Sequence, residues 1–161
     1  MATKRKPKRP RPASRARRPA KRAAPRRPKR KQPESSRART LSAVLTVGDI
    51  QRSLGWYQGA LGFTVEDRWE FDGMLQGVDL KAGNARLSLS QDDWAKGRDR
   101  VKGVGMRLYF STVQDLDKLA AGIMARGGTL DYEPKLQPWG DRTFAVTDPD
   151  GFHLTFAQRK R

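Results

Sequence analysis

A repeat at an offset of 66 residues is the feature of this sequence that most constrains its fold. The stretch VGDI at 47–50 matches VQDL at 113–116, and Gly62 matches Gly128 at the same offset. Each copy carries the pattern of a strand, a helix and three further strands. One such unit alone would leave a sheet face unburied, so we expect the two units to pack against each other.

Local signals place the elements within each copy. Asp49 and Asp115 stand at helix N-cap positions, apolar residues follow at helical spacing, and glycines at 62 and 127–128 end the helices. The predicted strands are 41–47, 63–70, 74–81 and 85–90 in the first copy, and 104–112, 129–133, 142–147 and 152–158 in the second. The sequence therefore predicts an α+β domain over residues 41–161, built from two βαβββ modules at about 41–91 and 104–158.

Residues 1–40 have a different composition from the rest of the chain. They hold 18 of the 34 Lys and Arg residues but only one of the 17 acids, so the whole net charge of +17 lies in this segment. They also hold seven of the ten prolines and no aromatic residue. Such a segment cannot bury enough apolar surface to offset the entropy of ordering it, so we predict a disordered basic tail.

Three stretches of the predicted domain carry a likeness to a known family. They are 47–63, with VGDI, Ser53, WY and LGF; 116–128, with LDKL and the paired glycines; and 138–152, with PWG, Arg142 and DPDGF. Their order and spacing resemble the vicinal oxygen chelate superfamily, which contains glyoxalase I, extradiol dioxygenases, fosfomycin-resistance enzymes and bleomycin-binding proteins. The resemblance implies a curved, partly closed eight-stranded sheet around a ligand cavity, with the helices outside, usually in a homodimer. It does not fix a reaction.

The resemblance also implies positions for a divalent metal, which the family's enzymes hold with His, Glu or Gln side chains. Carried over to this sequence, these positions are Ser42, Leu108 (or Arg107 if a bulge intervenes) and Thr155. Gln91 is the only adequate donor near 84–91. Hydroxyl groups are poor ligands, leucine offers none, and arginine would repel a cation. We therefore expect neither a metal nor a cofactor.

Without a metal, a cavity must hold its ligand by shape, stacking and a few polar groups. The ligand-binding candidates are Trp69, Trp94, Trp139, Arg142, His153 and Thr155. Trp69 and Trp139 could instead be core or dimer-interface residues. Arg142 could pair with Asp141 or Asp148. His153, the sole histidine, is either a hydrogen-bonding residue or general base, or a half-solvated residue at the cavity rim.

The basic segment suggests a second binding function. A run of Lys and Arg without aromatic residues favours salt-dependent, non-specific contacts with phosphates of DNA, RNA or another polyanion, and not base stacking. The candidate residues are Lys4, Arg5, Lys6, Lys8, Arg9, Arg17, Arg18, Arg26, Arg27, Lys29, Arg30 and Lys31. No stretch is apolar enough to predict a membrane span. We expect the protein in the cytoplasm, with nuclear or nucleoid association through the tail as an alternative.

Three hypotheses of function follow. The favoured one is a metal-independent protein that binds and sequesters a small aromatic or drug-like molecule, as in antibiotic resistance, and it has no catalytic residues. The second is an enzyme, either a lyase or dioxygenase with an atypical site or a metal-free one that uses His153. The third is a nucleic-acid-associated protein whose domain serves to dimerise the basic tail.

Overall fold

The computed structural model describes residues 40–158, so the predicted basic tail lies outside the described residues except for Thr40. The elements are β1 (Ala43–Val47), α1 (Ile50–Gly59), β2 (Thr64–Phe71), β3 (Met74–Ala82), β4 (Ala85–Gln91), β5 (Arg107–Ser111), α2 (Leu116–Ala125), β6 (Tyr132–Leu136), β7 (Arg142–Thr147) and β8 (His153–Gln158). Neither α1 nor α2 is long and apolar enough to cross a membrane.

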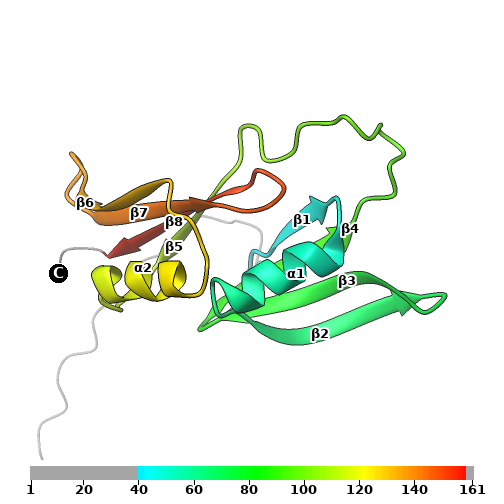
Figure 1. Ribbon diagram of the computed structural model, residues 1–161, viewed down its shortest axis with the longest axis horizontal. Coiled ribbons are helices and arrows are strands. Elements are labelled where there is room, and N and C mark those ends of the chain that lie inside the picture. The colour runs from blue at the N-terminus through cyan, green and yellow to red at the C-terminus, as the bar shows by residue number, and fades with distance from the viewer. Residues whose placement is uncertain (1–39, 159–161) are drawn as a thin grey trace, which may run out of the picture. The chain divides into compact units, whose positions relative to one another are not determined.

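The strands confirm the repeat predicted from the sequence (Figure 1). Strands β1–β4 form one sheet in the order β1-β4-β3-β2, and strands β5–β8 form a second in the matching order β5-β8-β7-β6. We name them sheet A and sheet B. In each sheet the first pair is parallel and the other two pairs are antiparallel. The eight predicted strands are thus divided between two four-stranded sheets of equal topology, with β1 and β5 each at an edge.

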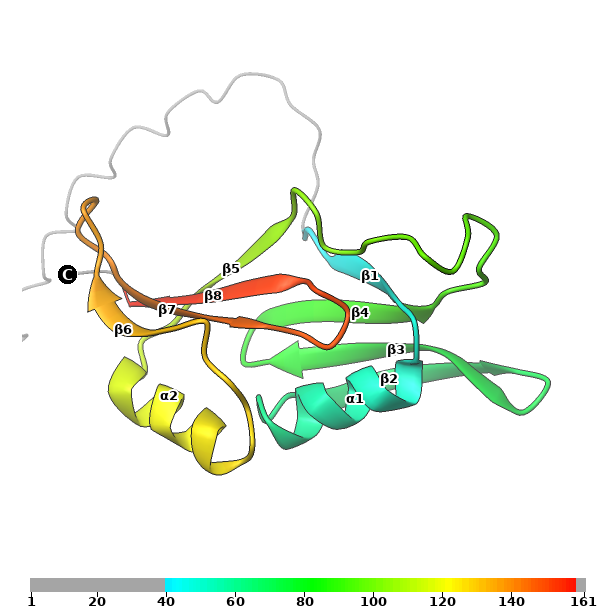
Figure 2. The same ribbon diagram turned by 45° about the horizontal axis from the view of Figure 1, so that its top comes forward.

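Each helix begins where the sequence predicts and packs on the sheet of its own module. The Asp49 carboxylate accepts a hydrogen bond from the Arg52 amide at 3.0 Å. Asp115 does the same for the amides of residues 117 and 118. Helix α1 packs against β3 and β4, and α2 against β6, β7 and β8. Figure 2 shows both helices on the same side of the strands, so each sheet has one helix-covered face and one face without a helix, which we call its open face.

One apolar core runs through both modules. Its largest side chains include Leu45, Leu80 and Leu89 from sheet A, and Phe144, Leu154, Leu116 and Ile123 from sheet B and α2. A series of rings joins the two parts: Phe63 lies 5.8 Å from Phe110, which stacks at 5.2 Å on Phe156. Because these rings bridge the modules, neither sheet has to bury its helix-covered face alone.

Two predicted strands differ from the observed ones by three residues at one or both ends, whereas the other six agree to within two residues at each end. The strand predicted at 104–112 begins only at Arg107, because Gly103 and Gly105 both have a φ of +74°, which is not an extended conformation. The strand predicted at 129–133 is observed as Tyr132–Leu136, and it contains Pro134. A proline cannot donate to a ladder, but β6 is an edge strand, where this is tolerated.

Candidate functional site

The side chains of the two most distinctive motifs bind each other across the modules. Asp150, in the turn between β7 and β8, accepts hydrogen bonds from the Gly48 amide at 2.7 Å and the Ser53 hydroxyl at 2.9 Å. The fully buried Tyr57 donates its hydroxyl to the Asp148 carboxylate at 2.9 Å. We call these five residues the clasp. Its donors lie on α1 or just before it, and its acceptors lie in the opposite module, so the clasp holds the modules together.

Burial dominates the electrostatics of the clasp. It raises the pKa of Asp148 above its ordinary value, although the Phe152 amide at 2.8 Å and the Tyr57 hydroxyl act in the opposite direction. Burial also raises the pKa of Tyr57 far above its usual range, and the neighbouring carboxylate of Asp148 adds to the effect. Tyr57 therefore keeps its proton at neutral pH and donates it to the Asp148 carboxylate.

The segment between β4 and β5 is tied down by a second polar cluster. The Asp92 carboxylate pairs with Arg100 at 2.7 Å and Lys102 at 2.9 Å. These interactions lower the pKa of Asp92 to about 2, and the hydrogen bond from Lys102 has the largest effect. The Lys102 ammonium also lies 4.5 Å from the ring centre of Trp94. Trp94, predicted to stack on a ligand, is thus stacked by a cation of its own chain.

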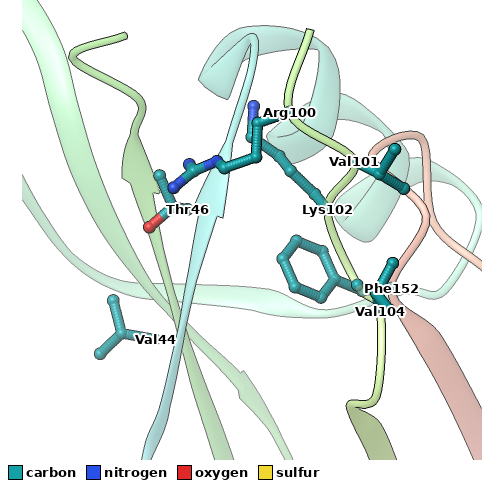
Figure 3. A pocket seen from close by; sticks show the side chains of 8 residues that line it. Val44, Thr46, Arg100, Val101, Lys102, Val104 and Phe152 are labelled. Carbon is teal, nitrogen blue, oxygen red and sulfur yellow. The ribbon is translucent and has the colours of Figure 1, made fainter. Parts of the chain in front are cut away.

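A pocket lies between β1 and this segment (Figure 3). Its volume is about 270 Å³, and it is lined by Val44, Thr46, Arg100, Val101, Lys102, Gly103, Val104 and Phe152. In Figure 3 the Arg100 guanidinium reaches toward Thr46, while Phe152 and Val104 face it from the other side. The modules predicted at about 41–91 and 104–158 leave most of this segment unassigned, because no local pattern indicates that residues 100–104 lie beside β1.

The open face of sheet A carries an aromatic platform. Trp69, Gly77, Ser90 and Thr46 are partners in one row across the sheet, and paired residues project to the same face. The Trp69 indole lies directly over Gly77, since a Cβ on that glycine would be 1.9 Å from the ring. Trp69 remains 43% exposed. Of the predicted ligand residues, Trp69 therefore lies on an open face, in a row that ends at the pocket.

Two carboxylates stand beside this platform. Asp67 and Asp79 are partners on β2 and β3, one row away from Trp69 and Gly77. Asp79 accepts a hydrogen bond from the Ser88 hydroxyl, and the Asp67 carboxylate accepts one from the Arg68 amide. Within residues 40–158 neither forms an ion pair. The platform is therefore bordered by two carboxylates that form no ion pair with a Lys or Arg side chain among residues 40–158.

The open face of sheet B holds two further predicted residues, His153 and Thr155. His153 is an exposed residue whose Nδ1 lies 2.9 Å from the Thr147 hydroxyl and 3.8 Å from the Asp131 carboxylate. Thr155 is 3% exposed, and its hydroxyl has no hydrogen-bond partner in the described part of the chain. The sequence indicated no carboxylate next to His153, because Asp131 is distant along the chain and comes close only through the pairing of β7 with its neighbours.

The remaining two candidates lie elsewhere. Trp139 is 65% exposed in the turn between β6 and β7. Arg142 bonds the Asp117 carboxylate of α2 at 2.6 Å, so it pairs with neither of the two acids considered from the sequence. Because Arg142 reaches α2, its guanidinium lies on the helix-covered side of sheet B and away from both open faces.

The positions implied for a metal do not offer a metal's ligands. The Gln91 side chain accepts from the Ile50 amide at 3.0 Å and donates to the Gly48 carbonyl at 2.8 Å, so its amide is already satisfied. Leu108 packs against the core, and the register places Arg107 on the open face with His153. In the described range, 40–158, no three His, Cys, Asp or Glu side chains come together. A guanidinium and hydroxyl groups do not fit a divalent cation.

Comparison with known proteins gives one consistent result. The profile described as "Glyoxalase/Bleomycin resistance protein/Dioxygenase superfamily" matches residues 39–156. A bleomycin resistance protein of Geobacillus stearothermophilus is 30% identical over 129 residues, which cover 72% of this chain and 93% of that protein. A putative lactoylglutathione lyase of Brassica oleracea is 26% identical over 133 residues, 79% of this chain, and the match spans only 46% of that lyase.

A solved structure shows the same architecture. A member of the glyoxalase/bleomycin resistance protein/dioxygenase superfamily from Sphaerobacter thermophilus superposes with a TM-score of 0.60 at 25% identity, covering 76% of this chain and 98% of that one. The likeness therefore extends over both modules.

Proposed function

The chain belongs to the glyoxalase/bleomycin resistance protein/dioxygenase superfamily, and from this premise we propose that it is a metal-independent protein that binds and sequesters a planar aromatic or drug-like molecule. The observation that carries the proposal is the Trp69 indole, which lies over Gly77 and is exposed on the open face of sheet A. A flat, exposed indole is a stacking surface for a planar ligand.

The surroundings of Trp69 favour a ligand that also carries positive charge. Asp67 and Asp79 border the platform without cationic partners among residues 40–158. A cation stacked on an indole gains from the ring's quadrupole, and nearby carboxylates add to this attraction. The row of small residues from Gly77 through Ser90 to Thr46 would let such a ligand extend toward the pocket at β1.

The test is a thermal-shift panel on the full-length protein with bleomycin, other planar cationic antibiotics and divalent metals. A ligand at about 100 times its dissociation constant should stabilise the fold by roughly 2.7 kcal/mol. Trp69→Ala should weaken binding about tenfold, the loss of one stacking contact. Trp139→Ala, which removes an exposed indole outside the platform, is the matched control and should leave affinity unchanged. Stabilisation by a metal alone would contradict the proposal.

A second variant tests the platform without removing the indole. Gly77→Ala places a methyl group where the ring lies, so Trp69 must swing away and the ligand-induced shift should disappear. Gly55→Ala on α1 meets no atom within 4 Å and serves as the control. Retention of full affinity by Gly77→Ala would mean that the ligand does not stack where we place it.

Dimerisation is the second part of the proposal. The edge strands β1 and β5 do not pair with each other, and apolar side chains near them, such as Val44 and Val104, are exposed. Unpaired edges and exposed apolar residues are features of surfaces that bind another chain. We expect sedimentation to give twice the mass of one chain, and a monomer at micromolar concentration would oppose this part of the proposal.

Residues 1–40 support a further candidate activity, contact with nucleic acid or another polyanion. Their net charge of +17 stands against a neutral remainder of the chain. Retention on DNA should fall steeply with salt and vanish when residues 1–39 are removed, whereas binding to the platform should survive that deletion. DNA retention by the shortened chain would assign the contact to the folded domain.

A further inference from the structure

A second pocket lies along α2, apart from the open faces of both sheets. Its volume is about 370 Å³, and it is lined by Gln114, Asp115, Lys118, Leu119, Gly122 and Arg126. The lining residues of the helix and of its two ends follow one another at spacings of three and four, so they share one helix face. Pockets for small molecules have volumes of roughly 300–1,000 Å³, so this one has room for more than a bare ion.

The guanidinium of Arg126 is held in place at one end of this pocket. Its Nε–H donates to the Ala60 carbonyl of the other module at 3.0 Å. The fork also lies against two glycines: a Cβ on Gly122 would be 3.2 Å from Nη1, and one on Gly62 would be 3.9 Å from Nη2. Glycine inside a helix is unfavourable relative to alanine, but at position 122 it leaves room for the guanidinium to lie back along α2.

The two cations of the pocket have no acidic partner among residues 40–158. The Nε–H of Arg126 forms the bond to Ala60, and the protons of Nη1 and Nη2 have no acceptor in this part of the chain. The ammonium of Lys118, two helical turns earlier, makes neither a hydrogen bond nor an ion pair there. A preset arginine fork and an ammonium on one helix face attract a group with two negative charges.

The rest of the lining restricts what this group can be attached to. The half-buried Leu119 offers an apolar surface between the two cations. Asp115 stands at the other end, where one carboxylate oxygen accepts from the amides of residues 117 and 118 at 3.0 and 3.1 Å. A second anionic group would be repelled there. Hydroxyl groups can instead bond to the other Asp115 oxygen and to the Gln114 amide.

We propose that this pocket binds a small phosphate monoester with a hydroxylated body, such as a sugar phosphate. The phosphate oxygens accept from Nη1 and Nη2 of Arg126 and from the Lys118 ammonium. The body lies over Leu119, with its hydroxyls toward Gln114 and Asp115. The pocket shares no residue with the platform on sheet A, so failure of either proposal leaves the other standing.

The test is a titration of the ¹⁵N-labelled full-length protein with ribose 5-phosphate, followed by NMR. Salt at about 0.15 M screens contacts of the probe with the basic residues 1–40. The amides of residues 60–62 and 114–126 and the Nε–H of Arg126 should shift and saturate, and ribose should shift none of them. Inorganic phosphate should bind more weakly, because it leaves Leu119 uncovered. Shifts outside these residues alone, or equal affinity for phosphate and its monoester, would overturn the proposal.

Three variants assign the binding to the two cations. Lys118→Gln removes an exposed ammonium that makes no contact described above, so the fold should persist while affinity falls about tenfold, the loss of one charge-assisted hydrogen bond. Arg126→Lys keeps the charge, loses the fork and should weaken binding by a similar factor. Arg52→Gln, an equal change of charge on an exposed residue of α1, is the matched control and should leave affinity unchanged. Full affinity in Lys118→Gln, or an equal loss in Arg52→Gln, refutes the site.

Discussion

Removal of one hydroxyl from the clasp gives the sharpest test of how the modules are joined. Tyr57→Phe deletes the donor that bonds Asp148 at 2.9 Å, and the two side chains are 0% and 4% exposed. Phenylalanine keeps the ring and its packing, so the loss is confined to the hydrogen bond. A bond to a charged group contributes about 1.5–3 kcal/mol. At roughly 4 °C for each kcal/mol, the melting temperature should fall by about 6–12 °C.

The pH dependence gives this prediction a second signature. Burial raises the pKa of Asp148 in the folded state, so the folded protein holds its proton more strongly than the unfolded chain does. The stability that this group contributes is therefore greatest below the unfolded pKa and is lost as pH rises through the folded pKa. The Tyr57 bond favours the ionised form. The gap in stability between wild type and Tyr57→Phe should therefore widen as Asp148 ionises and narrow in acid.

Urea unfolding of both proteins between pH 3 and pH 8 measures the gap. Tyr132→Phe is the matched control, because that hydroxyl bonds the neutral Thr143 side chain at 3.1 Å and should cost about 0.5–1.5 kcal/mol at every pH. A Tyr57→Phe loss below 0.5 kcal/mol, or a loss that does not change with pH, would refute the claim that a charged, buried bond joins the modules.

Three other predictions follow from single features. Gly103→Ala should destabilise the fold strongly, because its Cβ would lie 2.1 Å from the Gly151 carbonyl oxygen. Gly105 has the same φ of +74°, but a Cβ there meets no atom within 4 Å. Gly105→Ala is therefore the control, and urea unfolding should show a loss of only about 1 kcal/mol. The pKa of Asp92 is lowered to about 2, so its stabilisation, present above the unfolded value, should be lost as pH falls from about 4 to about 2, and Asp92→Asn should flatten that part of the stability curve. Retention of the full chain on DNA should fall about linearly in log–log plots against salt, with a slope that decreases as charges in residues 1–40 are neutralised.

Periodicity and caps were enough to predict the repeat, both helices and the eight strands. These features are local: Asp49 and Asp115 cap their helices, and the face of Ile50, Leu54, Tyr57 and Leu61 is buried as its spacing indicates. The largest errors in strand bounds concern the edge strands β5 and β6. The start of β5 depends on the conformation of the glycines before it, and β6 contains a proline that only an edge strand tolerates. The core residues could be predicted from local patterns, because each helix or strand has a single apolar face to bury.

The site was harder to predict, because its contacts join residues distant in sequence. Nothing around Trp69 indicates that its ring covers Gly77, and nothing around His153 indicates Asp131. Trp94 was predicted to stack on a ligand, yet the Lys102 ammonium lies over its ring. Arg142 was expected to meet a ligand or to pair with Asp141 or Asp148, and it pairs instead with Asp117 of α2. Each of these outcomes depends on strand register and on loop paths, which composition and spacing do not fix.

The residues that identify the family and the residues that offer chemistry occupy different places in this fold. Ser53, Tyr57, Asp148 and Asp150 have their polar groups bonded to one another across the modules, so a likeness carried by these motifs reports the fold and leaves the ligand open. The open faces, with Trp69 on one and Arg107 on the other, lie outside that bonding. Effects on stability and on binding should therefore be separable. Tyr57→Phe should lower the melting temperature and leave ligand affinity intact. Trp69→Ala should weaken ligand binding and leave the melting temperature unchanged. A variant of the clasp that weakened binding as much as folding would mean that the platform depends on the junction between the modules.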